Sequence, residues 1–173
     1  MRIKKYSLLI ILLLATVWMS GNVVGQSNIQ VNASLKFKNL QNDLVELKNY
    51  TGQITIINLW STWSASCVKE MPVMERIHQD YYAQNVKVVG IAVFSDNKKI
   101  GQMLRLTKVS YPVLIASKDQ VKVFGNLSII PQTFILDANG NVLDHFVGSQ
   151  SFNKLSRVID RLIESQTLSK NLN

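Results

Sequence analysis

The chain has 173 residues, a formal net charge of +8, 47% hydrophobic residues and 17% charged residues. This length suits one globular domain, and the apolar fraction excludes a disordered chain. A single cysteine excludes an intramolecular disulfide framework and a zinc ribbon. The basic residues occur singly or in pairs such as Lys98-Lys99 and form no stripe, so we expect no nucleic-acid partner.

Residues 1–25 have the pattern of a secretory signal peptide. A weakly polar run of 13 residues, Ser7 to Met19, follows a basic start and leads to small residues up to Gly25. A bilayer span needs about 17–25 residues, so the run is too short for a permanent membrane helix. We expect cleavage after Gly25 and export to the periplasm or the extracytoplasmic face of the cell envelope. An uncleaved anchor is the alternative, and only then is membrane contact expected. The basic residues are Arg2, Lys4 and Lys5.

The first half of the remaining chain predicts a strand, a helix and a second strand. Residues 26–34 are polar and predict a flexible lead-in, and residues 35–47 predict one or two edge strands. The β-branched run 54–60 is typical of a strand buried on both faces. Apolar residues then recur every three or four positions, which predicts a helix over about residues 66–82 with a kink at Pro72. The expected inward stripe is Cys67, Met71, Met74, Ile77 or His78, and Tyr81.

The second half predicts a hairpin followed by a helix. After a buried strand at residues 86–93, the pattern indicates a helix at 96–108, a short strand at 111–115 and a helical turn at 121–124. Strands at 133–136 and 142–146 flank the turn signal Asp137-Ala138-Asn139-Gly140. A final helix runs from 151 to about 165, and a polar tail covers 166–173.

These elements predict an α/β domain over residues 35–165. A strand–helix–strand half forms a parallel crossover, and a hairpin and a helix form the second half. Together they give a central mixed β-sheet flanked by helices, which is the thioredoxin fold.

Residues 57–72, INLWSTWSASCVKEMP, resemble the segment written FWATWCxPCxxEMP in the TlpA/ResA-like thioredoxins, which are exported thiol-disulfide proteins. Residues 130–137 resemble the cis-proline segment of that family, residues 139–142 its hairpin, and Gly52 its turn before the first core strand. The resemblance extends over residues 37–162 and implies the thioredoxin fold.

The resemblance fails at one position of the motif. The family pattern is Cys-x-x-Cys, whereas residues 64–67 read Ser-Ala-Ser-Cys. Dithiol exchange needs one thiolate to attack a disulfide and a second thiol to resolve the mixed disulfide, and a serine hydroxyl does neither. We therefore expect no autonomous dithiol catalysis. Serine is favoured at helix N-caps, so Ser64 is expected to cap the helix.

Two opposite effects act on the pKa of Cys67, the one candidate catalytic thiol. The start of a helix lowers a thiol pKa, whereas burial raises it. The sequence leaves both outcomes open. Cys67 is either a buried thiol without chemistry or a single thiol that reacts with a partner protein, a small disulfide or a peroxide.

Pro131 is the other candidate site residue. The resemblance implies that the Ile130–Pro131 bond is cis and faces the motif, with a simple turn proline as the alternative. Ile130, Pro131 and Trp63 would then form a groove for an extended peptide, although Trp63 also fits a half-buried structural role. Glu70 is expected to support the N-terminus of the helix.

Two functions follow, and a third is weaker. The chain is either a redox protein that uses Cys67 on a protein partner bearing a thiol or a disulfide, or a non-catalytic module that binds a protein or peptide. A one-cysteine peroxidase fits Ser-x-x-Cys, but peroxiredoxins have a proline seven residues before the cysteine, where this chain has Trp60. No cofactor and no metal site are expected, because His78 and His145 have no carboxylate or cysteine at ligand spacing.

Overall fold

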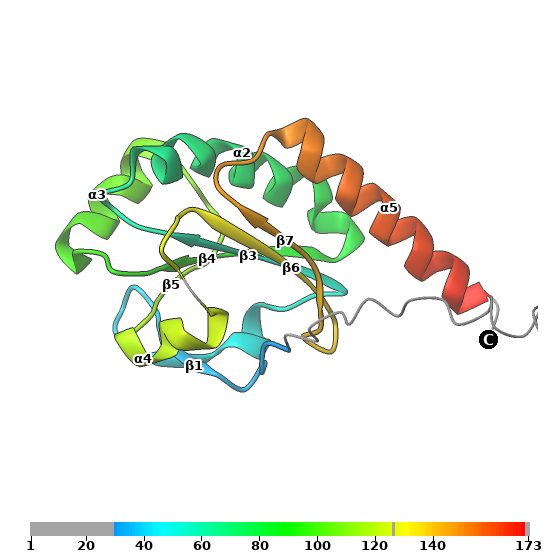
Figure 1. Ribbon diagram of the computed structural model, residues 1–173, viewed down its shortest axis with the longest axis horizontal. Coiled ribbons are helices and arrows are strands. Elements are labelled where there is room, and N and C mark those ends of the chain that lie inside the picture. Colours follow the sequence, from blue (N-terminus) through cyan, green and yellow to red (C-terminus); the bar gives the residue numbers. More distant parts are fainter. Residues whose placement is uncertain (1–29, 126, 172–173) are drawn as a thin grey trace, which may run out of the picture.

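The computed structural model of the protein describes residues 30–125 and 127–171. These residues form a seven-stranded mixed sheet with helices on both faces (Figure 1). The expected signal peptide, residues 1–25, lies outside the described residues. Among the described residues, every helix is too short or too polar to traverse a lipid bilayer.

The strands follow one another across the sheet in the order β2-β1-β5-β4-β3-β6-β7. Their bounds are β1 (Lys36–Lys38), β2 (Leu44–Glu46), β3 (Ile54–Trp60), β4 (Val86–Ala92), β5 (Val113–Ile115), β6 (Gln132–Asp137) and β7 (Val142–Val147). The α-helices are α2 (Ala65–Tyr81), α3 (Asn97–Thr107), α4 (Lys118–Val121) and α5 (Phe152–Asn171). Short 3-10 helices lie at η1 (Leu47–Tyr50), η2 (Tyr82–Gln84) and η3 (Lys122–Phe124).

Strand β3 is the line along which the two halves of the domain meet. On one side it pairs in parallel with β4, from Ile54 opposite Val86 to Trp60 opposite Ala92. On the other side it pairs antiparallel with β6, which continues through a hairpin into β7. The predicted parallel crossover and the predicted hairpin are therefore both present, and the predicted thioredoxin fold is confirmed.

All seven residues of β3 are buried, because both faces of the sheet are covered. Ile54 and Ile56 belong to the core beneath α2, α3 and α5. Ile57 and Leu59 point the other way, into the core covered by β1, η1 and the α4–η3 segment. Figure 1 shows α2, α3 and α5 along one face and α4 with β1 along the other.

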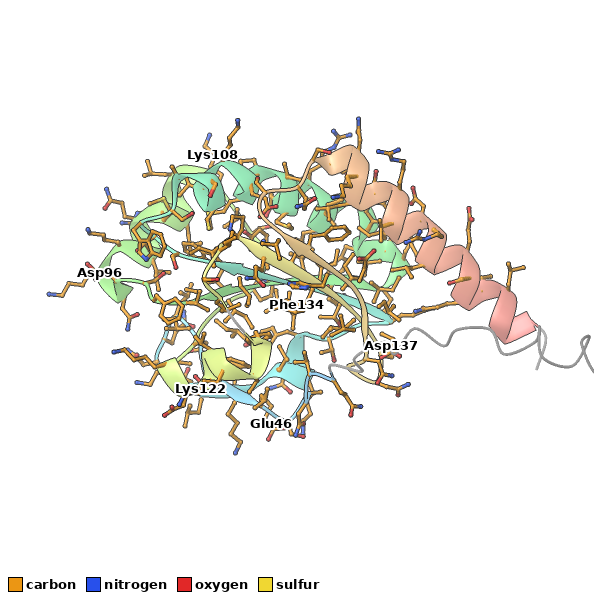
Figure 2. The ribbon with its side chains drawn as sticks, in the orientation of Figure 1. Glu46, Asp96, Lys108, Lys122, Phe134 and Asp137 are labelled. Carbon is orange, nitrogen blue, oxygen red and sulfur yellow. The ribbon has the colours of Figure 1, made fainter. Side chains whose placement is uncertain are left out.

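Phe134 of β6 is completely buried in this second core, and Figure 2 labels it near the middle of the molecule. Its ring lies 4.1 Å from the His145 ring in a stacked arrangement and 5.6 Å from the Phe124 ring, between the centroids. Aromatic pairs at these separations add packing energy beyond the burial of their area. The hairpin and η3 are thereby joined on this face.

The inward stripe predicted for α2 is confirmed. The helix continues through Pro72, and its buried face packs on β3 and β4. The buried apolar residues of the stripe are Cys67, Met71, Met74, Ile77 and Tyr81.

The prediction of a flexible lead-in at residues 26–34 is wrong for its second part. The backbone N–H of Val31 donates to the carbonyl of Gly140 at 2.8 Å, and the Val31 side chain is only 2% exposed. Gln30 also forms an isolated bridge with Asn141. One apolar side chain in a polar stretch thus fills part of the second core and fixes the described part of this segment.

The last helix is longer than predicted, since α5 continues to Asn171 and takes up most of the predicted polar tail, residues 166–173. The Gln53 side chain donates to the Gln166 carboxamide at 2.8 Å, and the Thr167 hydroxyl donates to the carbonyl of Ile163. Polar side chains thus satisfy one another or the helix backbone, so the end of the apolar stripe does not mark the end of the helix.

A buried carboxylate joins the two halves of the domain. Glu70 of α2 is 1% exposed, and it accepts hydrogen bonds from Asn58 Nδ2 at 2.9 Å and from the Gln150 backbone N–H at 2.6 Å. Asn58 Nδ2 also lies 3.2 Å from Thr133 Oγ1 on β6. Burial raises the pKa of the Glu70 carboxyl, although the bonds from Gln150 and Asn58 act in the opposite direction. The expected support of the helix N-terminus is not the role that the structure gives this residue.

We predict that Glu70→Gln removes one component of the pH dependence of stability. A carboxyl whose pKa is raised on folding contributes stability below its unfolded pKa, and this contribution is lost as the pH rises through the folded pKa. The free energy of unfolding of the variant should therefore improve relative to the wild type as the pH rises from the unfolded pKa of glutamate, about 4.3, through the raised pKa of the folded state. Urea unfolding at a series of pH values measures this difference. The glutamine can keep a hydrogen bond to Asn58 if the Asn58 carboxamide rotates by half a turn. Asn58 Oδ1, which has no partner within the described residues, would then accept a bond from the new amide.

Glu75→Gln is the control of opposite sign. Burial acts to raise the pKa of Glu75, but hydrogen bonds from the Ser110 hydroxyl and backbone N–H, with a further one from Gln79, outweigh it and lower the pKa. Stability from this group is present above its unfolded pKa and is lost as the pH falls, so Glu75→Gln should lose most relative to the wild type at neutral pH. A difference between Glu70→Gln and the wild type that is constant with pH would contradict the assignment to Glu70.

Candidate functional site

The motif lies where β3 ends and α2 begins. Ser64 has extended backbone angles (φ −93°, ψ 107°), and its hydroxyl oxygen accepts a hydrogen bond from the Cys67 backbone N–H at 3.3 Å. This is the N-cap geometry that serine favours. The hydroxyl also lies 3.0 Å from Ser66 Oγ. Ser64 is thus the N-cap of α2.

Cys67 is completely buried, and its sulfur belongs to the core beneath α2. Burial raises the pKa of the thiol, while hydrogen bonds to the Ser64 hydroxyl and to the Ser61 backbone oppose this rise without cancelling it, and the Glu70 carboxyl raises the pKa further. Of the two effects that the sequence left in balance, burial is the larger. The thiol is therefore protonated near neutral pH and lies out of contact with solvent.

The Ile130–Pro131 peptide bond is cis, as the resemblance implies. Gln132, the next residue, pairs with Leu59 near the end of β3, so the proline lies beside the start of the motif loop. The Pro131 carbonyl accepts a hydrogen bond from the Gly148 N–H at 2.8 Å, which fixes the loop to the end of the hairpin. Ile130 packs against the core cluster that contains Cys67. The structure thus brings Ile130 and Pro131 to the motif.

The backbone next to this proline is available to a partner. Among the described residues, neither the N–H nor the carbonyl of Ile130 makes a backbone hydrogen bond. An extended peptide can pair with such free groups by adding to the edge that they present. Exposed apolar side chains flank the position, with Ile129 58% exposed and Val147, opposite Gln132 on β7, 50% exposed.

Trp63 is 67% exposed, so it does not have the alternative role of a half-buried structural tryptophan. Its indole Nε1 donates to the carbonyl of Phe94 at 3.1 Å, which anchors one edge of the ring and leaves its face to solvent. An anchored, exposed tryptophan offers a large apolar surface at low cost in conformational entropy, a property typical of binding sites.

A loop that sequence reasoning missed supports the motif. Residues 93–96, after β4, are joined to residues 61–63 by several hydrogen bonds besides that of Trp63. The Ser61 hydroxyl donates to the Val93 carbonyl, and the Thr62 N–H donates to Ser95 Oγ at 3.1 Å. In the sequence, Ser95 and Asp96 follow a buried strand. These polar residues indicated the start of a helix but no contact with the motif.

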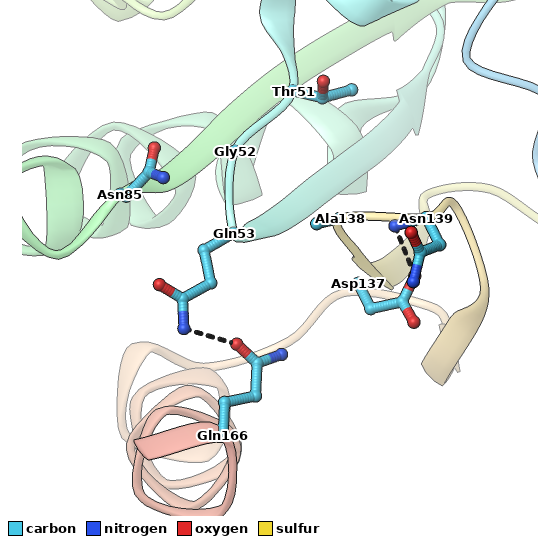
Figure 3. A pocket seen from close by; sticks show the side chains of 8 residues that line it. All are labelled: Thr51, Gly52, Gln53, Asn85, Asp137, Ala138, Asn139 and Gln166. Carbon is cyan, nitrogen blue, oxygen red and sulfur yellow. Dashed lines mark hydrogen bonds between the residues drawn. The ribbon is translucent and has the colours of Figure 1, made fainter. Parts of the chain in front are cut away.

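The cavity drawn in Figure 3 lies at the other end of β3. It has a volume of about 600 Å³ and is lined mainly by polar groups. Across it the Gln53 side chain bonds to that of Gln166, and the Asn139 N–H bonds to Asp137 Oδ1 at 2.9 Å (Figure 3). None of the predicted site residues lines this cavity, so its size does not make it the candidate site. The lining residues are Thr51, Gly52, Gln53, Asn85, Asp137, Ala138, Asn139 and Gln166.

Comparison with known proteins identifies the family of the chain. Residues 29–145 match the AhpC/TSA family. The chain is 27% identical over 116 residues to the thiol-disulfide oxidoreductase ResA of Geobacillus kaustophilus, a match that covers 67% of each chain. It is 29% identical over 144 residues to the thioredoxin-like protein YneN of Bacillus subtilis, which covers 82% of this chain and 84% of that one.

Solved structures show the same fold. A thiol:disulfide interchange protein of the thioredoxin family from Chlorobium tepidum superposes with a TM-score of 0.68 at 24% identity, over 78% of this chain and 96% of that one. StoA from Bacillus subtilis gives a TM-score of 0.61 at 21% identity, over 74% and 97% of the two chains. The match over residues 29–145 and the curated relatives place the chain in the AhpC/TSA family, as a TlpA/ResA-like member with the thioredoxin fold.

Proposed function

We propose that this protein is an exported member of the thiol-disulfide oxidoreductase group that binds extended polypeptides beside Pro131 and does not catalyse dithiol exchange by itself. The observation that carries the proposal is the state of the motif. Its one thiol, Cys67, is completely buried with a raised pKa, and Ser64 stands in the position of the attacking thiol.

The burial of Cys67 argues against each reaction that the thiol could perform. Attack on a disulfide or on a peroxide requires a thiolate that the substrate can reach. Burial disfavours the thiolate, and the Cys67 side chain is completely enclosed in the core. The peroxidase alternative meets the same obstacle and also lacks a proline at position 60. A single-thiol reaction with a partner is the competing proposal, and it requires the start of α2 to open.

The surface around the cis-proline supports binding. Trp63 presents an anchored ring, Ile129 and Val147 are exposed, and the Ile130 backbone is free to pair. These groups are the parts needed to hold an extended chain, with main-chain bonds for affinity and apolar contacts for selection. Neither the main-chain bonds nor the apolar contacts require a second cysteine.

Export is inferred from the sequence of residues 1–25, which combines a basic start, a short apolar run and small residues before Gln26. The proposed location is the periplasm or the extracytoplasmic face of the envelope.

The first test measures the accessibility of Cys67. We expect a thiol reagent to label the native protein far more slowly than the denatured protein, because reaction requires the start of α2 to open. Mass spectrometry of timed samples gives both rates. Ser66→Cys is the matched control, since residue 66 is exposed one position away and its thiol should react at once. Native labelling of Cys67 as fast as that of this control would favour the single-thiol reaction.

The second test separates binding from thiol chemistry. With carboxymethylated insulin B chain as the unfolded probe, we expect Cys67→Ala to keep the affinity of the wild type and Trp63→Ala to weaken it by about tenfold, the effect of removing one buried aromatic contact. Fluorescence anisotropy of labelled probe measures both. Tyr82→Ala is the matched control, because Tyr82 is 56% exposed at the far end of α2. Loss of binding in a folded Cys67→Ala variant would sink the proposal.

The third test restores the missing thiol. Ser64→Cys should form an intrachain disulfide with Cys67 and catalyse insulin reduction by dithiothreitol, because it rebuilds the Cys-x-x-Cys spacing at the start of a helix. The reduced variant should also lose about 1 kcal/mol of stability with the serine cap. Ser66→Cys adds a thiol at the wrong spacing and should stay inactive. A folded Ser64→Cys variant with neither disulfide nor activity would contradict the assigned geometry of the motif.

A further inference from the structure

A second cavity lies outside the cis-proline site, at the carboxyl end of the parallel strands. It has a volume of about 460 Å³ and separates the connection from β4 to α3 from the connection between β5 and α4. This volume is within the range of small-molecule pockets. Phe94 and Ser95 line it from the first connection, and Ile115 and Lys118 from the second.

The topology of the sheet creates this cavity. Strands β4 and β5 are adjacent and parallel. After β4 the chain passes to α3, whose Met103 and Leu104 pack on the core beneath α2, whereas after β5 it passes to α4, whose Val121 belongs to the other core. Figure 1 shows the two helices on opposite faces of the sheet. Adjacent parallel strands whose connections leave on opposite faces open a crevice at their carboxyl ends, where α/β proteins commonly bind ligands.

Phe94 is held in this cavity in an unfavourable conformation. Its φ is +49°, in the left-handed region that bulky side chains avoid, and its ring is 49% exposed. The bond from Trp63 Nε1 to the Phe94 carbonyl fixes the backbone there. Neither burial nor backbone preference accounts for an exposed phenylalanine at this position. Strained residues of this kind gather at binding sites.

The charge of the cavity favours an anion. Lys118 has no carboxylate partner among the described residues. Lys118 is the one charged residue that the structure describes in the lining of the cavity, and Asp119, next to it in the chain, pairs with Lys122 at 2.7 Å. The cavity therefore has the cationic Lys118 on one connection and the aromatic Phe94 on the other.

We propose that this cavity binds a small organic carboxylate with a flat apolar body. The body lies against Phe94 and Ile115, and the carboxylate faces Lys118. The site is separate from the polypeptide groove, and it does not depend on the function proposed above. The loop that carries Phe94 and Ser95 also holds Thr62 and Trp63, so the two sites share a support.

The test is a titration of the purified protein with 3-phenylpropionate, followed by the amide chemical shifts. We expect saturable shifts at Phe94, Ser95 and Lys118, and about fivefold weaker binding of the neutral analogue 3-phenylpropan-1-ol, the effect of losing one exposed ion pair. Shifts that do not saturate, or that spread over the surface without a maximum at these residues, would mean an adventitious additive only and would overturn the proposal. Equal affinity for the two probes would overturn the assignment of the carboxylate to Lys118.

Two variants with matched controls sharpen the test. Phe94→Gly should weaken binding by about tenfold while leaving the melting temperature unchanged or higher, because glycine accepts a positive φ without strain. Lys108→Gly is the control, because Lys108 also has a positive φ, +54°. Lys108 lies at the opposite end of α3 from Asp96 (Figure 2), so Lys108→Gly should leave binding unchanged.

Lys118→Glu should weaken carboxylate binding by more than the fivefold loss of the ion pair, because it also adds a like charge, whereas Lys108→Glu makes the same change in net charge outside the cavity and should leave binding unchanged. If Phe94→Gly fails to fold, the Lys118→Glu result decides alone. Full binding by a folded Lys118→Glu variant would overturn the proposal.

Discussion

The carboxylate of Glu70 holds the two halves of this domain in register. It extends from α2, accepts one bond from Asn58 on β3 and another from the backbone just before α5, and Asn58 in turn contacts Thr133 on β6. A buried carboxyl with only neutral partners is costly, because burial penalises its charged form. That cost falls close to where β3 pairs with β6, so the bonds to Glu70 add a link between the motif helix and the second half to the one that the β3–β6 pairing provides.

The Ser64 hydroxyl and the Cys67 thiol of the motif have different structural environments. The Ser64 hydroxyl satisfies the first turn of α2, and the loop around it is attached to residues 93–96 by hydrogen bonds. Cys67 belongs to the same turn, and its side chain is buried among apolar side chains of the core. The same geometry that would position a reactive pair of thiols therefore hides the one thiol present. Trp63 is exposed, and the Ile130 backbone groups make no backbone hydrogen bond within the described residues, so neither feature depends on a reactive thiol.

Most of the fold could be predicted from the sequence, because the periodicity of β3, α2 and β4 reflects burial directly. The ends of the domain could not. Val31 is one apolar residue in a polar stretch, and its burial depends on a distant contact with Gly140. The polar end of α5 is helical because the side chains of Gln53 and Gln166 meet across elements far apart in the chain. Local pattern carries no information on such contacts.

The candidate site could be predicted in part. Ser64, Cys67 and Pro131 were found through the order and spacing of the motifs, but the balance between helix start and burial at Cys67 required the packed structure. The role of Glu70 was missed, although Asn58 in the middle of a buried strand was a signal, since a polar group there needs a partner. Phe94 gave no signal, because a positive φ at phenylalanine follows from the bonds around it and not from its own preference.

The completely buried Cys67 also bears on how the protein responds to its surroundings. A domain with a pair of vicinal thiols exists in two covalent forms, and its stability follows the redox poise of the compartment. With one thiol, shielded from solvent, this chain has a single covalent form and protects its sulfur from stepwise oxidation to sulfenic and sulfinic acids. On the proposed function, the conformation of the chain would therefore not follow the oxidant supply of its compartment.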